Sequence, residues 1–275
     1  MSEILAGFSL LELLALKFIS RLSRYVYYSY SNSQFSMMNI INRFAVTIAS
    51  LLSVQSSIAQ DIFIIPNLFI SLRNFEYSVY NGNVRGKISS LGGGVTGIYQ
   101  RFYIDLSGER NITTDEESII DSLYNTIEFE RTDFAMSIGY GVNKSISTFI
   151  GYKYGNSTLT ELAPSPFEGA KNTLKGKGLF IGAGGIWPVR DWGTFSFSAA
   201  YAKMLAHYKS FALGTTIGDA NGTSLTVEWK APLTQNLYYD ISLMRHDYYY
   251  ENFDLIASDI AEQIFSIRLG ISYKF

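Results

Sequence analysis

Seven charged residues of both signs are the first candidates for chemistry, because they fall on strand faces that otherwise carry small and polar residues. They are Asp105, Asp133, Lys153, Glu228, Lys230, Asp240 and Arg268. If these faces enclose the narrow, low-dielectric interior of a closed sheet, the cations and carboxylates are expected to pair, since unpaired buried charge is costly. The pattern then predicts a charge network that fills and stiffens the interior of the closed sheet. The alternative is that these residues line a path for solutes.

The two histidines, His207 and His246, are candidates for acid–base or metal chemistry. Neither has a second histidine at the spacing of a metal site, so we expect no zinc. His246 precedes Asp247 near the end of a predicted strand, and an Asp or Ser within its reach would favour a hydrolase. No paired aspartates lie on a facing strand and no motif marks a serine nucleophile. We therefore predict no enzyme and place His246 at an exposed rim.

A glycine-rich stretch, Gly92 to Gly97, matches the three-glycine pattern of dinucleotide-binding turns. Such a turn opens a helix, whereas residues 98–104 continue as a strand. These glycines are better explained by a tightly packed barrel wall, and we expect no cofactor. The acidic stretch Asp115 to Glu117 reads as a solvated loop, with divalent-cation binding as the alternative.

Composition narrows the class of protein. The 275 residues carry a net charge of −2, which argues against a nucleic-acid partner. The chain has no cysteine, which excludes disulfides and thiolate chemistry. Its 20 tyrosines, 19 phenylalanines and 23 glycines, with a mean hydropathy of +0.09, are typical of strands that have one apolar and one polar face.

Period-two alternation predicts ten strands and an antiparallel up-and-down transmembrane β-barrel. The predicted strands are 67–80, 87–98, 100–109, 127–142, 145–156, 175–187, 193–206, 222–232, 237–249 and 263–275. Tight turns at 142–145, 188–191 and 232–236 alternate with longer polar loops at 110–126, 157–174, 207–221 and 250–262. The break near Tyr99 and Gln100 has no turn residues, so eight strands are the alternative.

The two faces of the predicted strands differ in chemistry. Phe134, Met136, Ile138 and Tyr140 share a face that we assign to lipid, while Ser137 and Gly139 face a filled lumen. Aromatic residues gather beside the turns and beside the loops, which predicts two interfacial girdles. The second girdle consists of Tyr77, Tyr80, Tyr208, Tyr248, Tyr249 and Tyr250.

The last strand of the sequence ends on an aromatic residue. Arg268, Gly270, Tyr273 and Phe275 have the spacing of a polar residue, a glycine two positions later, and aromatics at the third-last and last positions. This segment resembles the carboxyl-terminal assembly signal of bacterial outer-membrane barrels. Together with the strand pattern, it makes residues 60–275 similar to small Gram-negative outer-membrane barrel proteins, of the OmpA-type and porin-like class.

The amino-terminal region resembles a secretory signal peptide over residues 37–59. Arg43 precedes the apolar run 44–52, which is too short to span a bilayer, and Ser57 and Ala59 provide small residues before a cut. We predict cleavage between Ala59 and Gln60. Residues 1–36 would then lie upstream of the natural start and need not fold.

The resemblance implies residence in the Gram-negative outer membrane, contact with its lipid and lipopolysaccharide, and insertion by the barrel assembly machinery. We expect a non-enzymatic barrel with a narrow, side-chain-filled lumen and a structural or loop-mediated binding role. A narrow passive channel is the alternative, and a rim hydrolase similar to the ten-stranded omptin proteases is the third possibility.

Overall fold

The computed structural model describes residues 62–79, 82–112, 127–162, 168–212, 214–254 and 259–275. They all belong to one compact unit, Gln60–Phe275. The predicted upstream segment 1–36, the signal peptide 37–59 and the cut between Ala59 and Gln60 lie outside these residues. In the described ranges, no helix has the length and hydropathy needed to cross a membrane.

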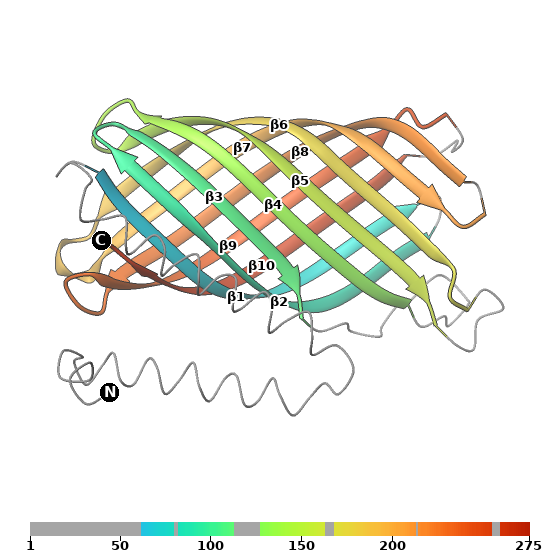
Figure 1. Cartoon of the computed structure of the whole chain (residues 1–275), viewed down its shortest axis with the longest axis horizontal. Helices are drawn as coiled ribbons and strands as arrows, with labels where there is room; N and C mark the ends of the chain where they lie inside the picture. Colours follow the sequence, from blue (N-terminus) through green and yellow to red (C-terminus); the bar gives the residue numbers. More distant parts are fainter. Residues whose placement is uncertain (1–61, 80–81, 113–126, 163–167, 213, 255–258) are drawn as a thin grey trace, which may run out of the picture. The chain divides into compact units, whose positions relative to one another are not determined.

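Ten antiparallel strands form one closed barrel, in which each strand pairs with its neighbours in sequence and β1 pairs with β10 (Figure 1). The strands are β1 (Ile62–Val79), β2 (Gly82–Tyr99), β3 (Phe102–Asn111), β4 (Ile127–Gly141), β5 (Ile146–Glu161), β6 (Lys171–Pro188), β7 (Thr194–Ser210), β8 (Gly214–Pro232), β9 (Leu237–Glu251) and β10 (Ile260–Tyr273). The predicted all-β class and the count of ten are confirmed. Tyr99 pairs with Phe102, so Gln100 and Arg101 form the uncertain turn, with Gln100 at a φ of 56°.

Four short connections lie at the end of the barrel where the chain finishes, which we call the turn end; the opposite end is the loop end. They are residues 100–101, 142–145, 189–193 and 233–236. Their residues favour turns: Asn143 Oδ1 accepts hydrogen bonds of 2.8 Å from the backbone N–H groups of Ser145 and Ile146. Gly193 adopts a φ of 116°, which suits glycine.

The predicted alternation of short and long connections is wrong at two places. β7 runs to Ser210 and β8 begins at Gly214, so the predicted loop 207–221 is mostly strand, and only residues 80–81 join β1 to β2. The segment 207–221 looked like a loop because most of its outward residues are polar. Its inward positions Thr216 and Ala220 are buried, which is the pattern of a strand standing in water.

The outer wall carries a band of apolar side chains. Ile138, Ile150 and Ile181 lie side by side on β4, β5 and β6 and are 54%, 54% and 62% exposed. On β10 the band continues through Phe265, Ile267, Leu269 and Ile271. An apolar surface of this extent is unfavourable in water and is the wall that lipid requires. The band therefore marks the membrane-spanning part of the barrel.

The strands continue beyond this band at the loop end. A transmembrane strand needs about 9–11 residues, whereas β7 has 17 and β8 has 19. Most of the additional outward positions are polar: on β6 the exposed Lys177 follows the exposed Leu179 toward the loop end. On β8 Thr223 takes the same place after Leu225. The loop end of the barrel wall thus extends past the lipid.

Candidate functional site: the closed lumen

The lumen lining changes its chemistry between the two ends of the barrel. Within the apolar band many of the inward positions are small or polar, such as Ser137 and Gly139 on β4 and Ser198 on β7, while aromatic rings such as Phe149 cover the inward glycines. Toward the loop end the same faces carry Phe129 on β4 and Met204 on β7, both buried. Each strand keeps period two while its apolar side switches from outside to inside. This switch suits a barrel that stands partly in lipid and partly in water.

Buried apolar residues close the lumen at the loop end; we call this group the loop-end core. It consists of Phe75, Tyr77, Val84, Ile88, Ile127, Phe129, Leu159, Leu174, Ala202, Met204, Ala206, Ala220, Tyr248, Tyr250, Phe253, Ile260 and Ile264. Phe75 on β1 and Phe129 on β4 stack with ring centroids 3.8 Å apart and planes 12° apart. Because β1 and β4 are not neighbours, this ring pair crosses the bore.

The loop-end core corrects the predicted second aromatic girdle. Tyr77, Tyr248 and Tyr250 point inward and are only 3–5% exposed, and Tyr208 packs against the same core. Tyr249 alone among the described tyrosines of that set faces outward, at 46% exposure. Tyr80 lies outside the described residues. The tyrosines fill the lumen because the strands extend several residues past the membrane before they turn.

Six charged side chains form a network across the lumen next to the loop-end core; we call it the lumen ion network. Arg73 pairs with Glu109 and, at 2.6 Å, with Asp133. Arg131 pairs with Asp133 at 2.8 Å and with Glu262 at 2.5 Å. Arg268 pairs with Glu109 at 2.9 Å. Three guanidinium groups thus face three carboxylates, so the network is neutral as a whole.

Hydroxyl groups satisfy much of the remaining hydrogen-bonding capacity of this network. Ser157 and Tyr250 donate to the two oxygens of Glu262 at 2.7 and 2.8 Å, and Ser71 donates to Glu109. Arg73, Glu109, Arg131 and Glu262 have side chains 1–5% exposed. Buried ion pairs persist only with such additional partners, because desolvating the charges is costly. The arrangement rigidly joins β1, β3, β4, β5, β9 and β10.

Three of the seven charged residues singled out in the sequence lie in or beside this network. Asp133 receives both Arg73 and Arg131, and Arg268 reaches Glu109. Lys153 donates to the hydroxyl of Tyr248, and its Nζ lies 4.7 Å from the centroid of that ring. This contact holds the lysine against the side of the loop-end core that faces the turn end.

The other four lie nearer the turn end and interact loosely. Asp105 accepts a 2.7 Å hydrogen bond from Thr96. Glu228 and Lys230 approach to 4.0 Å with about a third of each side chain exposed. Asp240 is opposite Lys230 in the β8–β9 register and packs against Gly270. The charged side chains are therefore less tightly paired at the turn end than in the ion network.

Four members of the ion network were not predicted from the sequence: Arg73, Glu109, Arg131 and Glu262. Face parity would have revealed three of them, since Arg131 shares a face with Asp133, Glu109 with Asp105, and Arg73 with the buried Ser71. Glu262 lies in the segment 250–262 that was predicted as a loop, whereas β10 begins at Ile260.

His246 is not at an exposed rim, as the sequence suggested, but faces the lumen below Tyr248. Its Nδ1 lies 2.8 Å from the hydroxyl of Ser224, and its ring stacks on Tyr248 with centroids 6.1 Å apart. Ser224 and His246 are direct cross-strand partners of β8 and β9. Among the described residues no hydrogen bond joins Nε2 to an orienting carboxylate, and no cluster of three metal-binding side chains occurs.

The residues of the predicted assembly signal lie on β10 and just after it. Tyr273 and Phe275 have ring centroids 4.6 Å apart, and the backbone N–H of Phe275 donates to the carbonyl of Ile64 at 3.1 Å. Arg268 lies over the ring of Phe69 at 3.7 Å. Gly270 leaves room for Asp240, since a Cβ there would lie 2.5 Å from a carboxylate oxygen.

Comparison with solved structures gives many barrels of similar architecture. The outer membrane protease OmpT from Escherichia coli aligns with a TM-score of 0.53 and 13% identity, covering 78% of this chain and 97% of that one. The fold is that of the outer-membrane β-barrel proteins. The translocator domain of autotransporter NalP from Neisseria meningitidis aligns over 90% of this chain and 99% of its own, with a TM-score of 0.49 and 11% identity.

Likeness at this level of identity establishes the fold and leaves the activity open. No family model matches the chain, and no curated protein matches it. The protein has the fold of the outer-membrane β-barrel proteins, a closed ten-stranded sheet with an apolar outer wall. Its function must be argued from its own residues.

Proposed function

We propose that this protein resides in the outer membrane of a Gram-negative bacterium as a closed barrel that neither conducts solutes nor catalyses a reaction. Its role is then structural, or consists of binding at the loop end. The observation that carries the proposal is the double closure of the lumen: the Phe75–Phe129 ring pair and the Arg131–Glu262 ion pair both cross the bore.

The closure opposes a channel on energetic grounds. An ion that passes the lumen ion network must displace buried, mutually paired side chains, and it must then cross the buried and mostly apolar loop-end core. Open barrels of larger circumference leave a water-filled bore, whereas narrow barrels are filled by side chains. The ten-stranded lumen belongs to the filled type.

Planar-bilayer conductance of the refolded full-length protein tests this proposal, after heat-modifiable migration on a gel has established folding. A folded barrel that gives no discrete conductance steps is the expected result. Stable steps would refute the proposal in favour of the channel. Lys153, Glu228, Lys230 and Arg268 would then be the residues to substitute for a change in ion selectivity.

One contact favours the hydrolase alternative, and it can be tested directly. The Ser224–His246 pair at 2.8 Å has the first two members of a nucleophile–base arrangement. Its cross-strand register accounts for the contact without catalysis, and the pair lies inside the lumen, where the loop-end core separates it from outside. We expect no labelling by a fluorophosphonate probe. Labelling of the folded protein that is lost in Ser224→Ala would establish the hydrolase instead.

A further inference from the structure

The outer wall of β6 and β7 carries five lysines at the loop-end edge of the apolar band, with the exposed Leu205 among them; we call this the lysine face. Lys171, Lys175 and Lys177 belong to β6, and Lys203 and Lys209 belong to β7; all five are outward and exposed. Lys209 is opposite Thr173 and Lys203 is opposite Leu179 in the β6–β7 register. Neighbouring strands are about 4.8 Å apart, so the ammonium groups form one positive surface.

Among the described residues, these lysines have no acidic partner of the kind that the outward Arg85 and Arg245 have. On the opposite wall, Arg85 pairs with Glu76 at 2.7 Å and Arg245 pairs with Asp247 at 2.8 Å. In the part of the chain that the structure describes, no ion pair involves a lysine of the lysine face. The nearest acidic position on β8, Asp219, is opposite Leu205 and contacts Asn252. A chain with a net charge of −2 thus concentrates uncompensated positive charge on one wall.

The position of the lysine face relative to the membrane defines what it meets. Directly below it on the same outward faces are Leu179, Ile181 and Tyr201, which are 60%, 62% and 50% exposed and belong to the lipid-facing band. The ammonium groups therefore stand where lipid headgroups begin. A ligand at this height has its acyl chains against the band and its anionic groups against the lysines.

We propose that Lys175, Lys177 and Lys203 bind the phosphate groups of a phosphorylated glycolipid of the lipopolysaccharide type in the outer leaflet. Lysine suits this role as a flexible cationic donor to phosphate. The inference deepens the proposed outer-membrane location and rests on it, but it is independent of whether the barrel conducts. Lys171 and Lys209, closer to the loops, extend the same surface toward more distant anionic groups.

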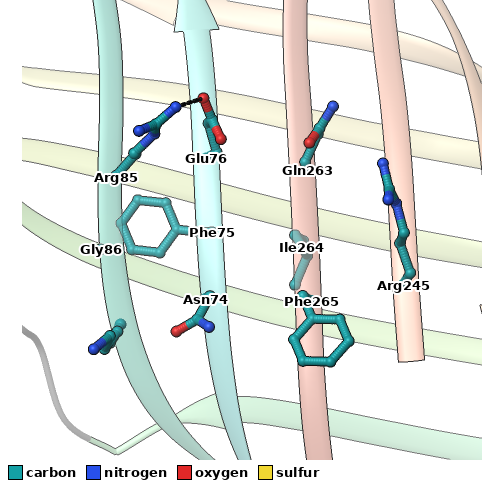
Figure 2. A pocket seen from close by; sticks show the side chains of 10 residues that line it. Asn74, Phe75, Glu76, Arg85, Gly86, Arg245, Gln263, Ile264 and Phe265 are labelled. Atoms are coloured by element: carbon teal, nitrogen blue, oxygen red, sulfur yellow. Dashed lines mark hydrogen bonds and ion pairs between the residues drawn. The ribbon is translucent and has the colours of Figure 1, made fainter. Parts of the chain in front are cut away.

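The opposite wall provides a matched control surface. Figure 2 shows a pocket there of about 530 Å³, lined by side chains that include Arg85, Arg245, Asn74, Gln263 and Phe265. Lys87 also lines it, so three cations are present. Two of them are already paired with carboxylates within their own wall. This wall should bind anionic lipid much less strongly than the lysine face, although it has a pocket and three cations.

The test compares two triple variants of the full-length protein in zwitterionic detergent, with lipid A binding measured by native mass spectrometry. Lys175→Gln/Lys177→Gln/Lys203→Gln removes the lysine face, and Arg85→Gln/Lys87→Gln/Arg245→Gln removes the control surface. A surface cation is worth about a factor of five in anionic-lipid affinity, so the first variant should lose roughly a hundredfold. The second should bind nearly as wild type. An equal loss in both variants, or no loss in the first, would overturn the proposal.

Two further measurements separate the ligand chemistry from folding and from free phosphate. Lys175→Arg/Lys177→Arg/Lys203→Arg should keep the binding, because it keeps the charge at positions that are exposed in the fold. Dephosphorylated lipid A should bind wild type and the first variant equally weakly. If the dephosphorylated lipid binds wild type as tightly as lipid A, or if inorganic phosphate protects these lysines from acetylation as well as lipid A does, the proposal is wrong.

Discussion

Arg131 on β4 and Glu262 on β10 meet across the bore, with 2.5 Å between Nη1 and Oε1. The two strands are separated by β3, β2 and β1 in the ring, so no sheet hydrogen bond brings them together. Ser157 bonds to both partners, as donor to Glu262 and acceptor from Arg131. At this point, side-chain contacts rather than backbone hydrogen bonds of the sheet connect the two sides of the barrel.

Breaking this pair should destabilise the barrel strongly. Arg131→Met leaves Glu262 buried without its cation, and removing one partner of a buried pair costs about 3–5 kcal/mol. The measurement is the urea midpoint of the heat-modifiable form in lipid vesicles. Arg85→Met is the control, because its pair with Glu76 is exposed to solvent and should contribute little to stability. Equal urea midpoints for the two variants would show that the buried pair contributes no more to stability than the exposed pair.

Opening the loop-end core should make the barrel conduct. Phe75→Ala/Phe129→Ala removes the stacked rings that cross the bore, and each truncation costs about 3–5 kcal/mol of stability as well. Where enough protein still folds, brief conductance events should appear that wild type lacks. Phe265→Ala is the control, since that ring faces outward and is 43% exposed. A folded double variant that stays silent would assign the closure to the ion network alone.

Replacing an inward glycine of β2 by alanine should destabilise the barrel, because there is no room for the added methyl group. In Gly92→Ala the added Cβ would overlap the ring of Phe69 and lie 2.7 Å from the carbonyl oxygen of Gly108. Overpacking of this kind costs about 1–3 kcal/mol, so the urea midpoint should fall. Gly97→Ala on the same strand has nothing within 4 Å of its Cβ and should leave the midpoint nearly unchanged. A reversed order of the two midpoints would contradict the lumen packing.

The limit of the lipid-facing band can be located with charged substitutions on one strand. Ile150→Lys places a charge in the middle of the band, where it costs about 2–4 kcal/mol. Thr158→Lys lies on the same outward face of β5 but beyond the band, where the cost should be near zero. Folding yield into lipid vesicles is the readout. If both variants fold equally well, the band does not face lipid.

Short-range patterns in the sequence determined much of this fold. Alternation along 127–142 and 263–275 predicted strands, turn residues such as Asn143 predicted the turn end, and face parity predicted the lipid-facing wall at Ile138 and Ile150. These features depend on neighbours within a few residues, because side chains in a strand alternate with a fixed period of two. The strand ends at the loop side were missed because a polar outward face in water looks the same as a loop.

The tertiary structure alone decided the lumen chemistry. The alternation of strand faces shows that Arg131 and Glu262 both face inward. It does not show that the two side chains lie at the same height along the barrel axis. That height depends on the tilt and stagger of strands around the closed ring, which are properties of the whole sheet. The same holds for Phe75 and Phe129. The sequence by itself therefore determined the wall of this barrel, and only the closed tertiary structure determined what fills it.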